Sequence, residues 1–127
     1  MTRRQVNRLT AKPFRPTASD VRRWTQVINC ILFHGELPPY RKIKVRRLHA
    51  KYALVQCHEG RQKNYCNIEI HNRFDTFGCF FSILAHELIH VADFMHYGDT
   101  KRPDHGRFFF SHRELMKNIG LRLGCGY

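Results

Sequence analysis

The sequence from Asp75 to Gly98, DTFGCFFSILAHELIHVADFMHYG, predicts the central helix of the protein. Asp75 or Thr76 can cap its start, the helical pattern runs to about Tyr97, and Gly98 provides a stop. Its apolar side chains recur at the spacing that is typical of a core helix: Phe77, Phe80, Phe81, Leu84, Leu88 and Val91.

The residues before this helix predict one further helix and a small sheet. Residues 17–20 (TASD) offer helix-capping side chains, and apolar residues then follow at helical spacing until a stop near Gly35. Three strand-like runs come next: 40–48, 51–58 and 64–71. In the first run, Ile43 and Val45 alternate with basic residues, which indicates a half-buried strand with a basic outer face.

A last helix is expected after the central one, with Asp104 as its cap and residues from His105 to about Ile119. This order of elements predicts an α+β fold with the helices packed on one face of a three-stranded sheet. The length of 127 residues suits one compact domain. We therefore expect a basic flexible arm at 1–16 and a single domain at 17–127.

The central helix contains His86-Glu87-Leu88-Ile89-His90, an HExxH motif. Residues four apart on a helix lie about 40° apart around its axis, so both imidazoles can bind one metal ion. Glu87 lies on the adjoining edge, where it can take a proton from a water beside the metal. Imidazole ligands suit zinc, and the apolar neighbours of the motif predict a buried site in which unpaired polar groups would be costly.

A hydrolytic zinc site needs a third protein ligand, and two histidines compete for that role. His96 stands six residues after His90, but a continuing helix would carry it about 240° round the axis, and Asp93 replaces the glycine that permits a sharp turn in the metzincin pattern. His105 follows a turn-rich loop, and Gly106 permits a close approach there. We favour His105, with His96 as a surface group.

HELIH at 86–90, followed by HGRFF at 105–109, resembles the signature of the SprT-like metalloproteases, HExxH and then HGxxF or HGxxW. The resemblance to this Spartan-related family covers roughly residues 18–120. It implies a zincin-like domain, one zinc ion held by His86, His90 and His105, and Glu87 as the general base. It also implies hydrolysis of peptide bonds, directed in several members at proteins bound to DNA.

The charge of the chain favours an anionic partner. Lys and Arg number 22 against 10 Asp and Glu, which gives a net charge of +12. Nucleic acid is the simplest such partner, because each neutralised phosphate releases counterions. The residues expected to contact DNA, single-stranded DNA included, are Arg41, Lys42, Lys44, Arg46 and Arg47. The rings that can stack on bases are Tyr40, Tyr52 and Trp24, although we favour Trp24 as a core residue.

Several features of the sequence favour an intracellular protein, cytoplasmic or associated with the nucleoid. The basic start lacks the apolar region of a secretory signal, and no run approaches the roughly 18 apolar residues of a spanning helix. The five cysteines are odd in number and form no CxxC pair, which favours reduced thiols over a disulfide framework.

Three functions compete on these grounds. The first is a zinc endopeptidase of the SprT-like type that acts on DNA-associated proteins. The second is a non-catalytic nucleic-acid-binding protein with a structural zinc. The third, a small metallonuclease, is disfavoured because the acidic residues that would bind Mg²⁺ are scattered.

Two details of the peptidase hypothesis are left open by the sequence. The group that stabilises the oxyanion can be a Tyr, a His or an Arg, with His96, His71 and Arg107 as candidates. The strand at 64–71 can pair with an extended substrate only if it lies at an edge of the sheet.

Overall fold

The computed structural model describes residues 12–97 of the chain. The expected helix at 105–119, the histidine at 105 and Arg107 lie outside the described residues. Within them the order of elements is α2 (Ala18–Phe33), β1 (Ile43–Arg46), β2 (Ala53–His58), β3 (Tyr65–His71) and α3 (Phe77–Tyr97). Two helices and one small mixed sheet confirm the α+β class for this part of the chain.

The capping residues in the sequence set the two ends of α2. The Thr17 hydroxyl accepts a hydrogen bond from the backbone N–H of Asp20, and the Asp20 carboxylate accepts one from the N–H of Thr17. This reciprocal capping box satisfies two backbone donors that the helix itself leaves unpaired. After Phe33 the chain turns through His34 and Gly35, which both adopt positive φ.

The sheet has the order β1-β3-β2, so that β3 is its central strand. β1 runs parallel to β3, and β2 runs antiparallel to it. The side chains of β3 alternate in burial: Cys66, Ile68 and Ile70 are buried on the inner face, and the residues between them lie on the outer face. The tight turn between β2 and β3 needs Gly60, because a Cβ there would lie 2.2 Å from the carbonyl oxygen of Lys63.

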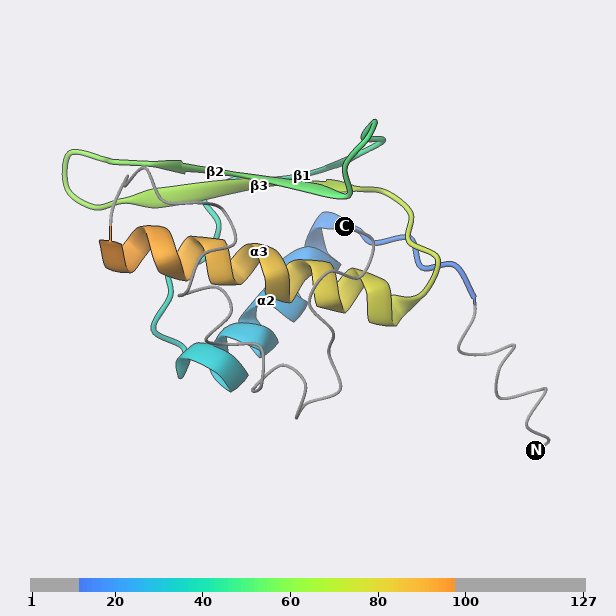
Figure 1. Cartoon of the computed structure of the whole chain (residues 1–127), viewed down its shortest axis with the longest axis horizontal. Coiled ribbons are helices and arrows are strands. Elements are labelled where there is room, and N and C mark those ends of the chain that lie inside the picture. Colours follow the sequence, from blue (N-terminus) through green and yellow to red (C-terminus); the bar gives the residue numbers. More distant parts are fainter. Residues whose placement is uncertain (1–11, 98–127) are drawn as a thin grey trace.

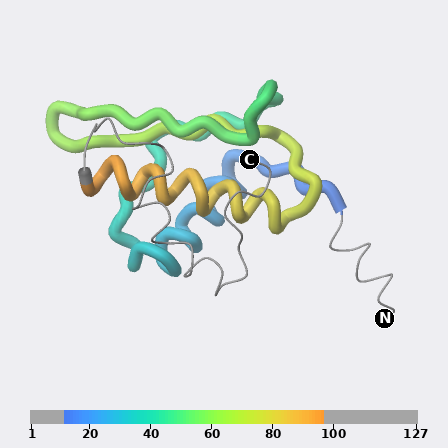
Figure 2. Tube along the Cα trace, in the orientation of Figure 1, coloured from blue at the N-terminus to red at the C-terminus, as the bar shows by residue number. Residues whose placement is uncertain are grey.

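Both helices cover the same face of the sheet, as Figures 1 and 2 show. α3 contacts β2 and α2, while α2 also contacts β1. The core between these layers is built from fully buried aliphatic and aromatic side chains, of which Phe80, Leu84 and Leu88 come from α3. Burial of α3 under the sheet brings the HExxH motif into the interior.

α3 is also long and apolar enough to be a candidate membrane span, which the sequence had not led us to expect. Between Phe77 and His96 its length and composition alone would allow it to cross a membrane, with a mean hydropathy of 1.3. In the fold, however, 61% of that segment is buried inside the protein, as in an ordinary core helix. The apolar character of α3 is therefore explained by its packing.

The folded unit includes part of the segment that the sequence assigns to a basic arm. The backbones of Phe14 and Phe74 exchange two hydrogen bonds, of 2.9 and 2.8 Å. The ring of Phe14 packs against Phe77 and Phe80 at the start of α3. This bridge fastens the chain before α2 to the chain that enters α3.

Candidate metal centre

The two histidines of the HExxH motif present the same ring atom to each other. Their Nε2 atoms lie 3.2 Å apart, and the ring centroids are separated by 4.9 Å with the planes at 68°. His86 is only 3% exposed, whereas His90 is half-buried. The site is thus closed at one histidine and more open at the other.

This geometry fits a zinc ion. Zinc bound at about 2.0–2.1 Å to each nitrogen, with a tetrahedral angle between them, places the nitrogens about 3.3 Å apart. The observed 3.2 Å agrees with that separation. The same distance also fits a direct hydrogen bond between one protonated and one unprotonated imidazole nitrogen, so the histidine pair suits two states.

Glu87 is a buried acidic residue whose charge acts on groups of neighbouring elements. It is 6% exposed and belongs to the buried part of α3. Burial raises the pKa of the Tyr40 hydroxyl, and the nearby Glu87 carboxylate raises it further. The charge of Glu87 also opposes ionisation of the Cys57 thiol on β2.

The described residues leave the third ligand of the zinc site open. α3 continues as a helix through Asp93 to Tyr97, so the sharp turn of the metzincin pattern is not made. His96 is exposed on the last turn of α3, and no group of three potential metal ligands occurs within residues 12–97. The favoured third ligand, His105, lies outside that part of the chain.

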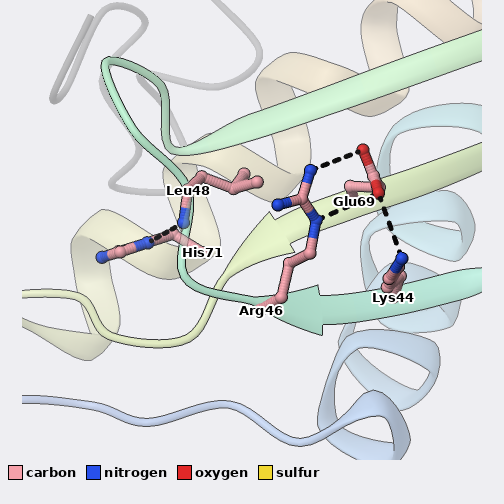
Figure 3. Close-up of polar contacts among 5 residues, drawn as sticks. All are labelled: Lys44, Arg46, Leu48, Glu69 and His71. Carbon is pink, nitrogen blue, oxygen red and sulfur yellow. Dashed lines mark hydrogen bonds and ion pairs between the residues drawn. The ribbon is translucent and has the colours of Figure 1, made fainter.

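Of the expected oxyanion-stabilising groups, His71 is placed where it cannot serve. Its side chain belongs to the outer set of β3, away from α3, and its Nδ1 accepts a 2.9 Å hydrogen bond from the N–H of Leu48 (Figure 3). Sequence reasoning did not connect Tyr40 with the motif, yet its buried hydroxyl lies within electrostatic range of Glu87. No spacing in the sequence links Tyr40 to the motif, because the two meet only through the fold.

The strand at 64–71 is not an edge strand, so the condition under which it could pair with a substrate is not met. β3 is flanked on both sides, by β1 and β2. β2 pairs with β3 alone among the described strands, and it is also a strand that contacts α3. Within residues 12–97, the open edge next to the HExxH helix therefore belongs to β2.

Some of the basic residues in and around β1 contact other side chains, and others form no ion pair within residues 12–97. Lys44 and Arg46 both approach Glu69 on the outer face of the sheet, as Figure 3 shows. The guanidinium of Arg41 lies over the ring of Tyr65, 4.5 Å from its centroid. Lys42 and Arg47 are exposed, and no ion pair is found for either within residues 12–97.

The aromatic residues expected to stack on bases are mostly occupied in the fold. Tyr40 is 5% exposed and is not available for stacking. Trp24 packs against Phe77 and Phe81. Tyr65 lies on the same outer face as Lys44 and Arg46, with its ring next to that of His58, so the aromatic group nearest the basic residues is one that the sequence did not single out.

Comparison with known proteins adds no relative to this description. No family model, no curated protein and no solved structure matches the chain. The HExxH helix and its surroundings are therefore the basis on which a function can be inferred.

Proposed function

We propose that the protein is a zinc-dependent endopeptidase of the SprT-like type, with a zincin-like domain, that acts on DNA-associated proteins. In this proposal His86, His90 and His105 hold one zinc ion, and Glu87 is the general base. The observation that carries it is the pair of Nε2 atoms 3.2 Å apart on a buried helix, with the Glu87 carboxylate on the residue directly after His86.

The residues divide the chemical work between binding the metal and transferring the proton. The histidines offer the neutral nitrogen lone pairs that zinc prefers. A bound zinc ion supplies Lewis-acid polarisation of the scissile carbonyl and of the attacking water. Glu87 removes a proton from that water, which then attacks the carbonyl carbon, and Glu87 returns the proton to the leaving amine.

The open edge of β2 is the surface that we propose for an extended substrate. The N–H of Ile68 donates to the carbonyl of Lys42, so the backbone groups of Ile68 point toward β1. Val55, which is directly opposite Ile68 on β2, therefore directs its own N–H and C=O away from β3. A substrate strand can pair with these groups next to α3.

DNA binding in this proposal relies on the outer face of the sheet and the residues just before and after β1. Lys42 and Arg47 offer exposed cations there, with no ion pair to another residue of 12–97, and Lys44 and Arg46 add charge that Glu69 partly neutralises. Contacts of this kind are independent of sequence and weaken as salt rises. They would bring the peptidase to proteins that are already bound to DNA.

A non-catalytic nucleic-acid-binding protein with a structural zinc is the second candidate. The burial of Glu87 favours it, because a substrate must reach a carboxylate that is only 6% exposed. The two candidates differ in what Glu87 does. In the second, Glu87 is a buried polar residue with no part in turnover.

The decisive experiment combines metal analysis with a cleavage assay. The full chain is loaded with zinc and incubated with a basic DNA-binding protein, with and without single-stranded DNA. Wild type is compared with two variants. Glu87→Gln keeps the shape of the side chain but removes its charge. Glu36→Gln is the matched control, because Glu36 is an exposed glutamate in the turn that follows α2. We expect one zinc per chain in all three proteins.

The peptidase proposal expects cleavage by wild type and Glu36→Gln, more rapid with DNA, and a loss of roughly 10²–10⁴-fold in Glu87→Gln. If all three proteins hold zinc and bind DNA but none cleaves, the structural-zinc candidate is correct. If Glu87→Gln cleaves as fast as wild type, the peptide-bond hydrolysis does not use this site.

A further inference from the structure

Two cysteines lie directly opposite each other in the β2–β3 hairpin. Cys57 of β2 and Cys66 of β3 are register partners, and both belong to the side of the sheet that faces the helices. Neither forms a disulfide in the structure. The pairing is not visible in the sequence, because it depends on the number of residues that the turn takes up.

The position of this pair in the hydrogen-bond ladder brings the two side chains close. The carbonyl of Cys66 accepts from the N–H of Arg41, on the β1 side of β3. The backbone groups of Cys66 therefore point away from β2, and Cys57 and Cys66 occupy a non-hydrogen-bonded pair. Opposed residues at such positions have Cα atoms about 4.5 Å apart, which lies within the range that a disulfide spans.

The two thiols already interact and differ in their reactivity. Hydrogen bonding between the two thiols lowers the pKa of Cys57. The same interaction, followed by burial, raises the pKa of Cys66. Cys57 lies on the edge strand and is partly exposed, whereas Cys66 is 2% exposed. An oxidant therefore reacts with Cys57 first, because Cys57 is the more exposed thiol and forms the nucleophilic thiolate more readily.

We propose that Cys57 and Cys66 form a redox-active dithiol that a peroxide converts into a cross-strand disulfide. The Cys57 sulfur attacks one peroxide oxygen and becomes a sulfenic acid, while the other oxygen leaves as water or an alcohol. Cys66 then attacks the Cys57 sulfur, and the sulfenic oxygen leaves as water with the Cys66 proton. Two thiols and hydrogen peroxide thus give one disulfide and two water molecules.

The fold favours this pairing over any other among the described cysteines. The Gly60 turn holds the register of the hairpin, so the partner of Cys57 is fixed before oxidation. Cys30 is exposed on α2, and Cys79 lies near the start of α3, so neither belongs to the hairpin. The site does not depend on zinc or on peptidase activity.

The test uses the reduced full chain and hydrogen peroxide. After treatment the remaining thiols are alkylated, the protein is digested with trypsin without reductant, and the peptides are identified by mass. Cleavage after Arg61 and Lys63 separates the two cysteines, so a disulfide appears as two peptides joined together and lighter by two hydrogen atoms. We expect the Cys57–Cys66 species in most chains, and its loss on addition of a dithiol reductant.

Two serine variants test the order of the steps, and a third is the matched control. Cys66→Ser should accumulate a sulfenic acid at Cys57 that dimedone traps, whereas Cys57→Ser should leave Cys66 reduced at the same peroxide dose. Cys30→Ser should form the disulfide as wild type does. The proposal is overturned if Cys57 and Cys66 are both alkylated in peroxide-treated wild type, or if Cys57 joins a different cysteine there. The wild-type digest alone decides this, even if a variant fails to fold.

Discussion

Arg46 and Glu69 face each other across the β1–β3 pair, with the Arg46 Nε 3.2 Å and one terminal nitrogen 3.5 Å from the two carboxylate oxygens. The same carboxylate lies 4.0 Å from the ammonium of Lys44 (Figure 3). Glu69 is thus an acid that two residues of the proposed DNA surface share. It sets how much of their positive charge remains available to a phosphate backbone.

Removal of this acid should strengthen binding to DNA. Glu69→Gln leaves Lys44 and Arg46 without their carboxylate, so we expect the affinity for single-stranded DNA to rise by between about 3-fold and 10-fold at low salt. The affinity should also fall more steeply with salt. Fluorescence anisotropy with a labelled oligonucleotide at several salt concentrations measures both quantities.

Glu59→Gln is the control for that experiment, because it makes the same change in net charge at an exposed position in the β2–β3 turn. If both variants gain equally, net charge alone explains the effect. If neither gains, the outer face of the sheet does not contact DNA.

The ionisation of Glu69 should report on Arg46. The hydrogen bond from Arg46 is the main reason why the pKa of Glu69 lies below its ordinary value, with the charges of Arg46 and Lys44 adding to it. A lowered pKa means that this contribution to stability is present above the unfolded-state pKa and is lost as pH falls through the folded-state pKa. In Arg46→Ala the pKa of Glu69 should move up toward the ordinary value.

A carboxyl titration followed by NMR measures this shift directly, and Arg47→Ala is the control, since no ion pair is found for Arg47 within residues 12–97. An unchanged Glu69 titration in Arg46→Ala would mean that the 3.2 Å contact does not persist in solution.

Zinc should stabilise the protein through the histidine pair. A ligand that binds only the folded state at 100 times its dissociation constant adds about 2.7 kcal/mol to the free energy of unfolding. We therefore expect zinc to raise the melting temperature of wild type and a chelator to lower it again. His86→Ala should abolish most of this response, because it removes one of the two nitrogens that lie 3.2 Å apart.

His49→Ala, at an exposed position after β1, should keep the full response to zinc. An equal shift in His86→Ala and wild type would place the metal elsewhere, and no shift in wild type would favour the direct hydrogen bond between the imidazoles.

What the sequence could predict in this fold was local. The capping box at Thr17 and Asp20, the alternation of β3 and the extent of α3 depend on residues within a few positions of each other, and the structure agrees with all three. The convergence of His86 and His90 is local in the same sense, because one helical turn separates them.

What the sequence could not predict depended on strand order and register. β1 pairs in parallel with β3 and not with its neighbour in sequence, β2, which makes 64–71 central and removes it as a substrate edge. The pairing of Cys57 with Cys66 and of Glu69 with Arg46 follows from the same arrangement. Tyr40 was expected to stack on bases, yet the fold buries it near Glu87.

The Tyr40 hydroxyl should lower the free energy of unfolding. It is buried, and no hydrogen-bond partner is found for it among the described residues. Since an unpartnered buried hydroxyl has lost its water without compensation, Tyr40→Phe should raise the free energy of unfolding by about 1 kcal/mol. Urea denaturation measures the change. Tyr65→Phe, on the half-buried outer face of β3, should leave stability nearly unchanged. A loss of stability in Tyr40→Phe would show that the hydroxyl has a partner.

The same variant should also change how stability depends on alkaline pH. Burial, and then the charge of Glu87, raise the pKa of Tyr40, so the folded protein holds the phenolic proton more tightly than the unfolded chain does. This contribution is fully present below the unfolded-state pKa of about 10 and is lost as pH rises beyond it. Wild type should therefore lose stability above about pH 10 that Tyr40→Phe keeps, and the gap between the two should widen. A constant gap from neutral to alkaline pH would mean that Tyr40 ionises as readily in the folded protein as in the unfolded chain.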